Sequence, residues 1–239
     1  DWSSDVCSSD LFWAFLPPIV GAATFIFLQA QGIVAVEGLG MPYAAFAMIG
    51  TLLWQTFVEA LQSPVSAVQT AKPMLARINF PRESILFAGL TLVLFNFLIR
   101  LVLIVVVMAV WRIAPGPGII VFPLAVVGLV ACGFAIGLAL LPIGALYGDV
   151  ARAIPIMSQF LMLLTPVVYP ARAGDFSAWM SLWNPITPAI VTARESLTAL
   201  PFSALQGFTF VTIISLGACV VGLAAFRLVM PIIIERLGG

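Results

Sequence analysis

The run SILFAGLTLVLFNFLIRLVLIVVVMAV, residues 84–110, decides the fold, because it is strongly apolar and contains a single charged residue, Arg100. A helix of about 20 apolar residues is long enough to cross the hydrocarbon core of a bilayer. The whole chain agrees: 62% of its residues are hydrophobic and its mean hydropathy is +1.17. Soluble domains contain only about 45–50% apolar residues. The sequence therefore predicts an all-α integral membrane protein.

Other apolar runs, separated by proline, glycine and charged residues, are interpreted in the same way. Together they predict about six transmembrane helices, each of roughly 20 residues. We expect residues 12–239 to form one membrane domain. In residues 1–11, DWSSDVCSSDL, the run CSSDL resembles a translated sequencing adapter, so we set them aside as a non-native leader. The alternative is a short polar tail before the first span. The predicted spans are residues 12–31, 43–65, 84–110, 119–141, 154–169 and 206–229.

The segment AKPMLARINFPRE, residues 71–83, gathers charge in a chain where only 8% of residues are charged. Its cations are Lys72, Arg77 and Arg82. Pro73 is tolerated in the first turn of a helix, and Phe80 is pushed toward an extended conformation by Pro81. The pattern predicts a short amphipathic helix across the ends of the spans. The alternative is an ordinary basic loop on the cytoplasmic side that contacts lipid phosphates.

The distribution of lysine and arginine favours a cytoplasmic N-terminus. In that orientation the basic residues of the inner side are Lys72, Arg77, Arg82, Arg152, Arg227 and Arg236. Those of the outer side are Arg112, Arg172 and Arg194. A short polar loop, LYGDVARA at residues 146–153, contains Asp149 and Arg152 and is then cytoplasmic as well.

The region between the last two spans is too long for a tight turn and too apolar for a solvated loop. Two short helices at residues 176–183 and 187–200, separated by NPITP, fit it better. Neither is long enough to cross a bilayer, so we expect short re-entrant or gate helices that protein or a water-filled cavity surrounds. Trp179 and Trp183 either stack on sugar rings and form a lid, or anchor the chain at the membrane interface.

Two charged residues interrupt the predicted spans. A charge near the bilayer centre costs about 2.5–3.5 kcal/mol on the insertion scale. Arg100 is the deepest, and Glu59 is nearer the inner end of its span. Lining a pathway and pairing helices are open roles for both. The alternatives are that Arg100 extends toward the outer headgroups and that Glu59 lies at the inner surface.

Several chemistries find no support in the sequence. There is no G-x-x-x-x-G-K-[ST] phosphate loop and no histidine, and the three cysteines do not form a metal-binding pattern. The formal net charge is zero, so we expect no nucleic-acid partner. Transport by such a chain needs energy from a partner or from an ion gradient.

Five ordered stretches carry a resemblance to a known family. They are MPYAAFAMIGTLLWQTFVEAL (41–61) followed by AKPMLARINFPRE, LYGDVARAIPIMSQFLMLLTPVVYP (146–170), WNPITPAIVTARESL (183–197) and RLVMPIIIERLGG (227–239). Together they resemble the permease subunits of type-2 ABC exporters, in the branch that exports polysaccharides, O-antigens and teichoic acids. The resemblance extends over residues 12–239.

The resemblance implies that the basic segment is a coupling helix that docks into a separate ATPase subunit. The residues carried over are Lys72, Pro73, Arg77, Phe80, Pro81, Arg82 and Glu83. ATP and Mg²⁺ would be bound by that partner, and this chain would bind no cofactor. The short helices near the C-terminus are similar to the family's outer gate. The residues placed there are Trp179, Trp183, Asn184, Pro185 and Arg194. The family's amphipathic N-terminal helix has no counterpart here, as expected of a truncated fragment.

The function implied is that of a transport subunit, not of an enzyme. Two copies would form a channel in the inner membrane, and a lipid-linked polysaccharide or similar polyol phosphate polymer would enter it from the cytoplasmic side. One alternative is a drug or lipid exporter of the same type. A second is an ion-coupled secondary transporter, for which Glu59 is a weak candidate carboxylate. A third is a membrane-embedded transferase, which Asp149 alone supports.

Overall fold

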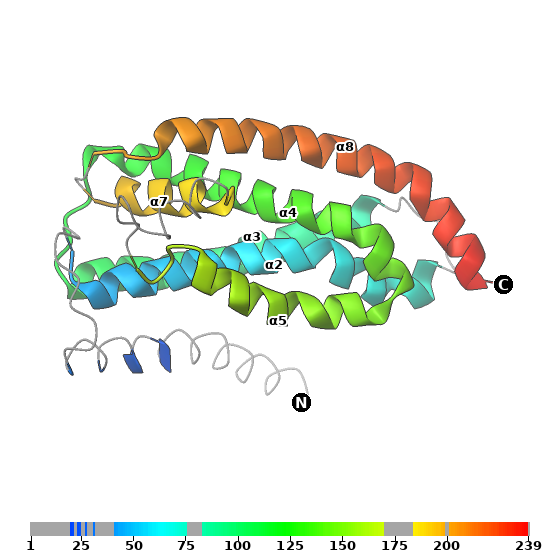
Figure 1. The fold of residues 1–239 in the computed structure, drawn as a ribbon, viewed down its shortest axis with the longest axis horizontal. Helices are drawn as coiled ribbons and strands as arrows, with labels where there is room; N and C mark the ends of the chain where they lie inside the picture. Colours follow the sequence, from blue (N-terminus) through cyan, green and yellow to red (C-terminus); the bar gives the residue numbers. More distant parts are fainter. Residues whose placement is uncertain are drawn as a thin grey trace, which may run out of the picture.

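The computed structural model describes residues 41–75, 83–169, 184–198 and 201–238, together with residues 20, 21, 23, 24, 27 and 31. Within these ranges the chain is helical and contains no strand, which confirms the predicted all-α class (Figure 1). The α-helices are α2 (Tyr43–Leu75), α3 (Glu83–Val110), α4 (Phe122–Leu146), α5 (Gly148–Leu164), α7 (Ile186–Ser196) and α8 (Leu205–Gly238), and a 3₁₀ helix, η1 (Pro117–Val121), precedes α4.

Four of the described helices are long and apolar enough to cross a membrane. They are α2, α3, η1 continued by α4, and α8. The predicted spans 43–65, 84–110, 119–141 and 206–229 fall on them. The predicted span 154–169 falls on α5, whose 17 residues are at the lower limit of spanning helices, about 17–25. The predicted span 12–31 lies largely outside the described residues, so a total of six spans stays a prediction.

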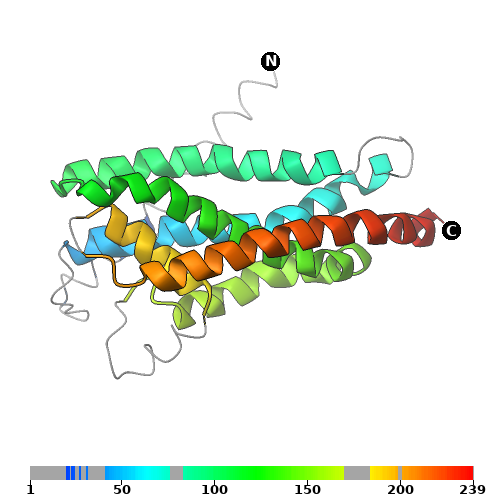
Figure 2. The same ribbon diagram turned by 90° about the horizontal axis from the view of Figure 1, so that it is seen from above.

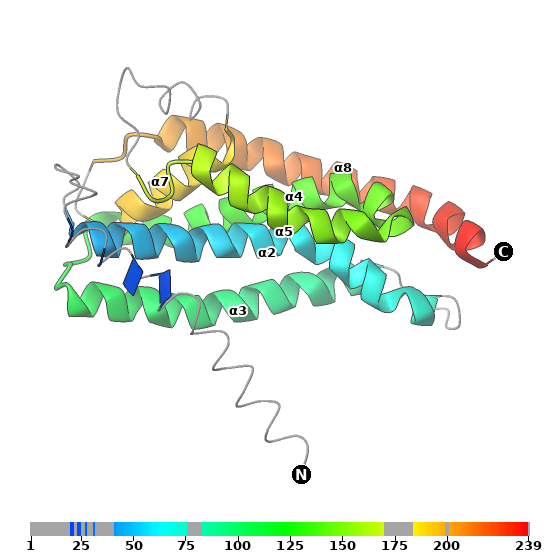
Figure 3. The same cartoon turned by 60° about the horizontal axis from the view of Figure 1, so that its bottom comes forward.

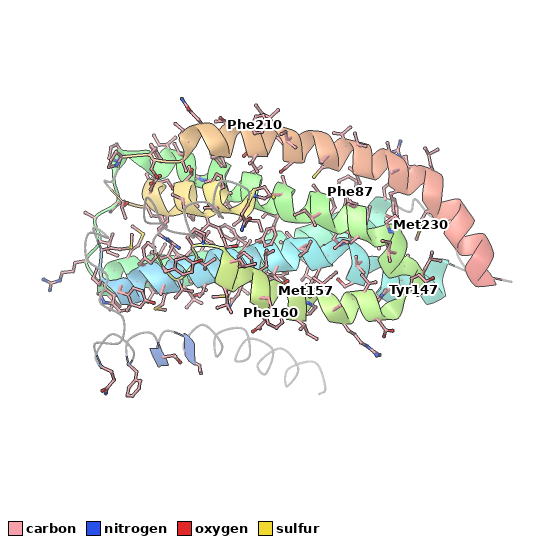
Figure 4. All side chains as sticks on the ribbon, in the orientation of Figure 1. Phe87, Tyr147, Met157, Phe160, Phe210 and Met230 are labelled. Atoms are coloured by element: carbon pink, nitrogen blue, oxygen red, sulfur yellow. The ribbon has the colours of Figure 1, made fainter. Side chains whose placement is uncertain are left out.

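Helices α2 and α4 lie at the centre of the bundle, and α3 and α8 flank them on either side (Figures 1 and 2). In the most apolar stretch of α2 and of α4, 78% and 56% of residues are buried, against 22% and 17% in α3 and α8. Phe87 of α3 and Phe210 of α8 are exposed apolar residues of these outer helices (Figure 4). An outer surface of this kind is compatible with lipid and not with water.

Helix α4 packs backbone to backbone on α2 through two glycines. A Cβ atom at Gly133 would lie 2.6 Å from the Phe57 carbonyl oxygen, and one at Gly137 would lie 2.3 Å from the Leu61 carbonyl oxygen. The stretch GFAIG, residues 133–137, is a G-x-x-x-G pattern, which allows close contact between membrane helices. These glycines therefore set the central contact of the bundle.

The predicted polar loop at residues 146–153 is wrong. Tyr147, with φ −114° and ψ 110°, is the one residue between α4 and α5, because its extended backbone is sufficient to reverse the chain. Asp149 and Arg152 therefore lie on the first turns of α5, where they form an exposed ion pair with Nη1 3.8 Å from Oδ1. A carboxylate in a first turn is favourable at the positive end of the helix dipole.

Helix α2 extends ten residues beyond its predicted end and contains both Pro64 and Pro73. Pro73 therefore does not begin a separate helix as predicted. Helix α2 continues through this position to Leu75, and its second half bends away from the first (Figure 3). Arg77, Phe80, Pro81 and Arg82 lie outside the described residues.

The two ends of the bundle carry different residues (Figures 1 and 4). One, here the Glu83 end, contains the end of α2, the start of α3, the α4–α5 turn and the C-terminal part of α8. Gln69 Nε2 donates to the Gly144 carbonyl there at 3.0 Å. The predicted inner residues Lys72, Arg152 and Arg227 share this end. Arg112 and Arg194 lie at the other, the Arg194 end. These five residues therefore lie as the predicted grouping requires. Arg77, Arg82 and Arg172 lie outside the described residues, and the assignment of either end to the cytoplasm stays a prediction.

Candidate functional site

Glu59 and Arg100, the charged residues of two predicted spans, form an ion pair between α2 and α3. Arg100 Nη1 lies 2.5 Å from Glu59 Oε2, and their side chains are 19% and 25% exposed, respectively. Asn96 Nδ2 donates to Glu59 Oε1, and Arg100 Nη1 donates to Thr56 Oγ1 at 3.4 Å. We call these four residues the intramembrane polar cluster.

The polar cluster lies near the middle of both helices. Glu59 stands in the central part of α2, whose candidate span is Tyr43–Ala71, and its predicted position at the inner surface stays a prediction. Arg100 turns toward α2 and does not extend to the headgroups, because Glu59 and Thr56 offer it nearer acceptors. Opposite charges at close range in a medium of low dielectric constant attract strongly. Of the roles left open, helix pairing is the one this geometry supports.

Arg194 is the second buried cation, and it holds α7 in place. It is 5% exposed, its Nη2 donates to the Val167 carbonyl at 2.6 Å, and its guanidinium carbon lies 3.6 Å from the centre of the Phe46 ring. Burial lowers the pKa of this guanidinium to about 9, and the charge of Glu195 opposes the shift. The group therefore keeps its charge at neutral pH.

Room for Arg194 is provided by a glycine on α2. A Cβ atom at Gly50 would lie 2.3 Å from the Val167 oxygen and 2.4 Å from Arg194 Nη2. The guanidinium thus joins α2, α7 and the segment after α5 at one point. Arg194, predicted as part of an outer gate, points into the protein interior, so its structural role is that of an anchor for α7.

The predicted helix at residues 187–200 corresponds to α7, which ends four residues earlier, at Ser196. Just before it, Asn184 Nδ2 donates to Thr165 Oγ1 at 2.7 Å, and Asn184 Oδ1 accepts from the Ile186 N–H at 3.0 Å. Asn184 and Pro185 also line an apolar cavity of about 550 Å³ between α4, α7 and α8. Trp179, Trp183 and the predicted helix at 176–183 lie outside the described residues.

Among the residues of the predicted coupling segment, Glu83 has a described side-chain contact. It is the first residue of α3. Glu83 Oε1 lies 2.6 Å from Arg227 Nε on α8, and both acceptor and donor are near the end of the bundle. The ion pair connects the start of α3 with α8. It places Glu83 beside a basic residue that the sequence assigned to the same side of the membrane.

Within the described ranges, no three His, Cys, Asp or Glu residues lie close enough to hold a metal ion. Cys132 is buried and Cys219 half-buried, and Cys219 Sγ donates to the Ala131 carbonyl at 3.4 Å. Elsewhere in the described ranges, Ser203 Oγ and the Ser203 N–H both donate to the Glu195 carboxylate on the exposed connection between α7 and α8.

No protein-family model matches the chain. Among curated proteins, the O-antigen export system permease protein RfbA of Myxococcus xanthus is 22% identical over 179 residues, which is 74% of this chain and 67% of that protein. The chain is similar to an export permease. The similarity agrees with the apolar helices of the structure, and it points in the same direction as the sequence motifs.

Proposed function

We propose that this chain is the membrane-spanning permease subunit of an ABC exporter that moves a lipid-linked polysaccharide or a similar polyol phosphate polymer across the inner membrane. The observation that carries the proposal is the similarity to an O-antigen export permease over 179 residues. The helices α2, α3, α4 and α8, each long and apolar enough to cross a bilayer, support a transport subunit.

In the proposed mechanism, two copies of the chain form the channel and two ATPase subunits bind at the Glu83 end. The sequence contains no phosphate loop, so ATP and Mg²⁺ are bound by the ATPase. The basic segment, residues 72–82, joins α2 to α3, and both helices belong to the packed bundle. A displacement of that segment by the ATPase therefore moves two spanning helices together.

The structure weakens the alternative of an ion-coupled secondary transporter. Such a transporter uses a carboxylate inside the membrane that can exchange a proton or cation. Glu59, the candidate named from the sequence, is already paired with Arg100 and accepts from Asn96. A carboxylate held by a neighbouring cation and an amide is a poor exchange site.

The proposal is tested by co-expression and co-purification with the ATPase subunit of an exporter of this type. Arg77→Glu combined with Arg82→Glu should abolish the complex, because two cations of the coupling segment become anions. Arg112→Glu combined with Arg172→Glu is the matched control, since these cations are predicted to face the opposite side of the membrane. Equal recovery of the ATPase with both double variants would overturn the docking role. Transport or ATP hydrolysis by this chain alone would overturn the proposed function.

A further inference from the structure

The apolar cavity beside Asn184 and Pro185 is a groove between α4 and α8, and nothing described so far fills it. Its volume is about 550 Å³, within the range of roughly 300–1,000 Å³ typical of small-molecule sites. Helix α4 lines it with residues between Cys132 and Ala139, and helix α8 with residues between Gly207 and Ala218. The start of α7 forms the third wall. We call this cavity the α4–α8 groove.

The groove opens through the outer surface of the bundle. Several residues that line it are exposed, among them Ala139 on α4 and Phe210, Ile214 and Ala218 on α8. Phe210 is 67% exposed and Ile214 is 53% exposed, and α8 is an outer helix of the bundle (Figures 2 and 4). All four residues lie inside the candidate spans Pro117–Leu146 and Leu205–Leu228. The mouth between α4 and α8 therefore faces the hydrocarbon of the bilayer, and an occupant that enters there comes from the lipid.

Small side chains keep the groove open. Small residues between membrane helices usually serve close packing, as Gly133 and Gly137 of α4 do against α2. On the side of α4 that faces α8, the small residue Ala139 is exposed instead, and so is Ala218 on the opposite wall. The space between these two alanines is therefore not closed by protein.

The lining of the groove asks for no hydrogen bond from an occupant. It is mostly apolar, and the described residues that contribute to it include no charged one. Asn184 uses its amide group on Thr165 and on the Ile186 N–H. In the described part of the chain, the buried polar side-chain atoms without a partner all belong to residues outside this groove. A hydrophilic ligand would lose its hydration here without compensation, whereas a hydrocarbon chain would gain van der Waals contacts.

The groove also has the length of a chain from one leaflet. On α8 it begins at Gly207, near the start of the helix at the Arg194 end, and ends at Ala218, near the middle of the candidate span Leu205–Leu228 (Figure 1). Eleven helical residues separate these positions, which corresponds to about 17 Å. Half of the hydrocarbon core is about 15 Å thick. A chain that enters from the Arg194 end can therefore lie along the whole groove.

We propose that the α4–α8 groove binds one acyl chain of a bilayer phospholipid from the leaflet at the Arg194 end, with the methyl end of the chain toward Ala139. The chain contacts α4, α7 and α8 at once. It thereby holds α7, whose 11 residues are too few to span the membrane, against two spanning helices. The site requires only that α4 and α8 cross a membrane and does not depend on the exporter proposal.

The test is photolabelling of the full chain in phosphatidylcholine nanodiscs. The probe is a phosphatidylcholine with a diazirine near the methyl end of one acyl chain, and peptide mass spectrometry locates the insertion. We expect insertion at Ile136, a half-buried residue of the groove, whereas a diazirine near the glycerol should shift it to Val211, which is closer to the Arg194 end. Ile213 is 71% exposed and does not line the groove, so it reports the lipid that merely surrounds the bundle.

Three outcomes of this labelling would overturn the proposal. Absence of insertion at Ile136 and Val211 would mean that a second copy or another part of the chain occupies the groove. The reverse order of the two probes would mean that the chain comes from the other leaflet. Insertion by a diazirine fatty acid but not by the phosphatidylcholine probes would mean that the occupant is a free fatty acid.

Two variants fill the groove from opposite walls. Ala139→Phe on α4 and Ala218→Phe on α8 should each lower insertion at Ile136 and Val211 several-fold relative to Ile213. Val221→Phe is the control, because Val221 is 69% exposed on α8 and does not line the groove. Undiminished insertion in a folded filling variant would overturn the site, and if one of the two variants misfolds, the other decides.

Discussion

Arg100 on α3 and Glu59 on α2 lie 2.5 Å apart, Nη1 to Oε2, so the charges in the middle of two spanning helices neutralise each other. The pair explains how both residues are tolerated at membrane depth. It also ties α3, which is otherwise a peripheral helix, to the centre of the bundle. Because Asn96 and Thr56 complete the cluster, the contact has a defined geometry.

Removing one charge of this pair should destabilise the fold more than removing both. Glu59→Leu leaves Arg100 unpaired, and we expect a loss of about 2.5–3.5 kcal/mol in the free energy of unfolding. In the double variant Glu59→Leu/Arg100→Met most of that loss should be recovered, because an apolar pair in lipid carries no desolvation penalty. Unfolding by SDS in mixed micelles measures the effect. A double variant as unstable as the sum of the single variants would contradict the pairing.

The second ion pair, Glu83 with Arg227, should contribute little to stability. The Arg227 side chain is 71% exposed, and exposed pairs contribute about 0–1 kcal/mol. We expect the melting temperature of Arg227→Ala to be close to that of the parent protein. A large loss of stability in that variant would mean that Arg227 carries a further contact. Measuring Arg227→Ala and Glu59→Leu in the same detergent allows a direct comparison of the two ion pairs.

Much of this fold is readable from local sequence patterns. The apolar run at residues 84–110 predicts α3 almost residue for residue, because span length and hydropathy are local properties. The ion pair between Glu59 and Arg100 is different. Each residue was recognised as unusual, but their pairing depends on the relative register of two helices that are joined by a segment with no register signal of its own. Sequence reasoning therefore identified the charges and missed the contact.

Arg194 is a second residue whose contacts could not be predicted from the local sequence. The sequence predicted Arg194 on the outer side with Arg112, and the structure places both at one end of the bundle. Its inward orientation, by contrast, depends on the space that Gly50 leaves on a distant helix. The G-x-x-x-G pattern at residues 133–137 was a local signal that would have predicted a close helix contact of α4, although not its partner α2. The helix end at Leu75 was missed because proline was taken as a boundary, although α2 accommodates it by bending.

The close contact of α4 with α2 should be sensitive to a single methyl group. In Gly137→Ala the new Cβ atom would lie 2.3 Å from the Leu61 carbonyl oxygen and 2.9 Å from Pro64. The helices must separate to relieve the overlap, so we expect the free energy of unfolding to fall by about 1–3 kcal/mol. A clear decrease in melting temperature measures this loss.

Gly217→Ala on α8 is the matched control for that substitution. Nothing lies within 4 Å of a Cβ atom at this position. Alanine is favoured over glycine inside a helix by about 0.8–1.0 kcal/mol in water, so this variant should be neutral or more stable. If both alanine variants melt at the same temperature, α2 and α4 do not pack at Gly137 as closely as the structure indicates.

The left-handed residue Arg112 offers a stabilising substitution. Its φ of 51° ends α3, and the Ile113 N–H donates to the Met108 carbonyl at 2.9 Å, as in a Schellman motif. Glycine adopts this conformation without the steric cost of a Cβ atom. We therefore expect Arg112→Gly to raise the melting temperature slightly. A decrease would mean that contacts of the Arg112 side chain stabilise the fold by more than the strain of its backbone destabilises it.

The anchoring of α7 by Arg194 should require a guanidinium and not merely a positive charge. Lysine cannot stack its ammonium as a plane on the Phe46 ring while it donates to the Val167 carbonyl, because its charge is a point and its donors are not arranged in a fork. We expect Arg194→Lys to cost about 2–4 kcal/mol, from the loss of a charged hydrogen bond and of a cation–π contact. Arg112→Lys is the control, because Arg112 is exposed at the same end of the bundle. Thermal melting in detergent compares the two, and limited proteolysis of the region around α7 reports its local opening. If Arg194→Lys matches the control in both measurements, charge alone holds α7, and the fitted arrangement of Arg194, Phe46 and Val167 is not required.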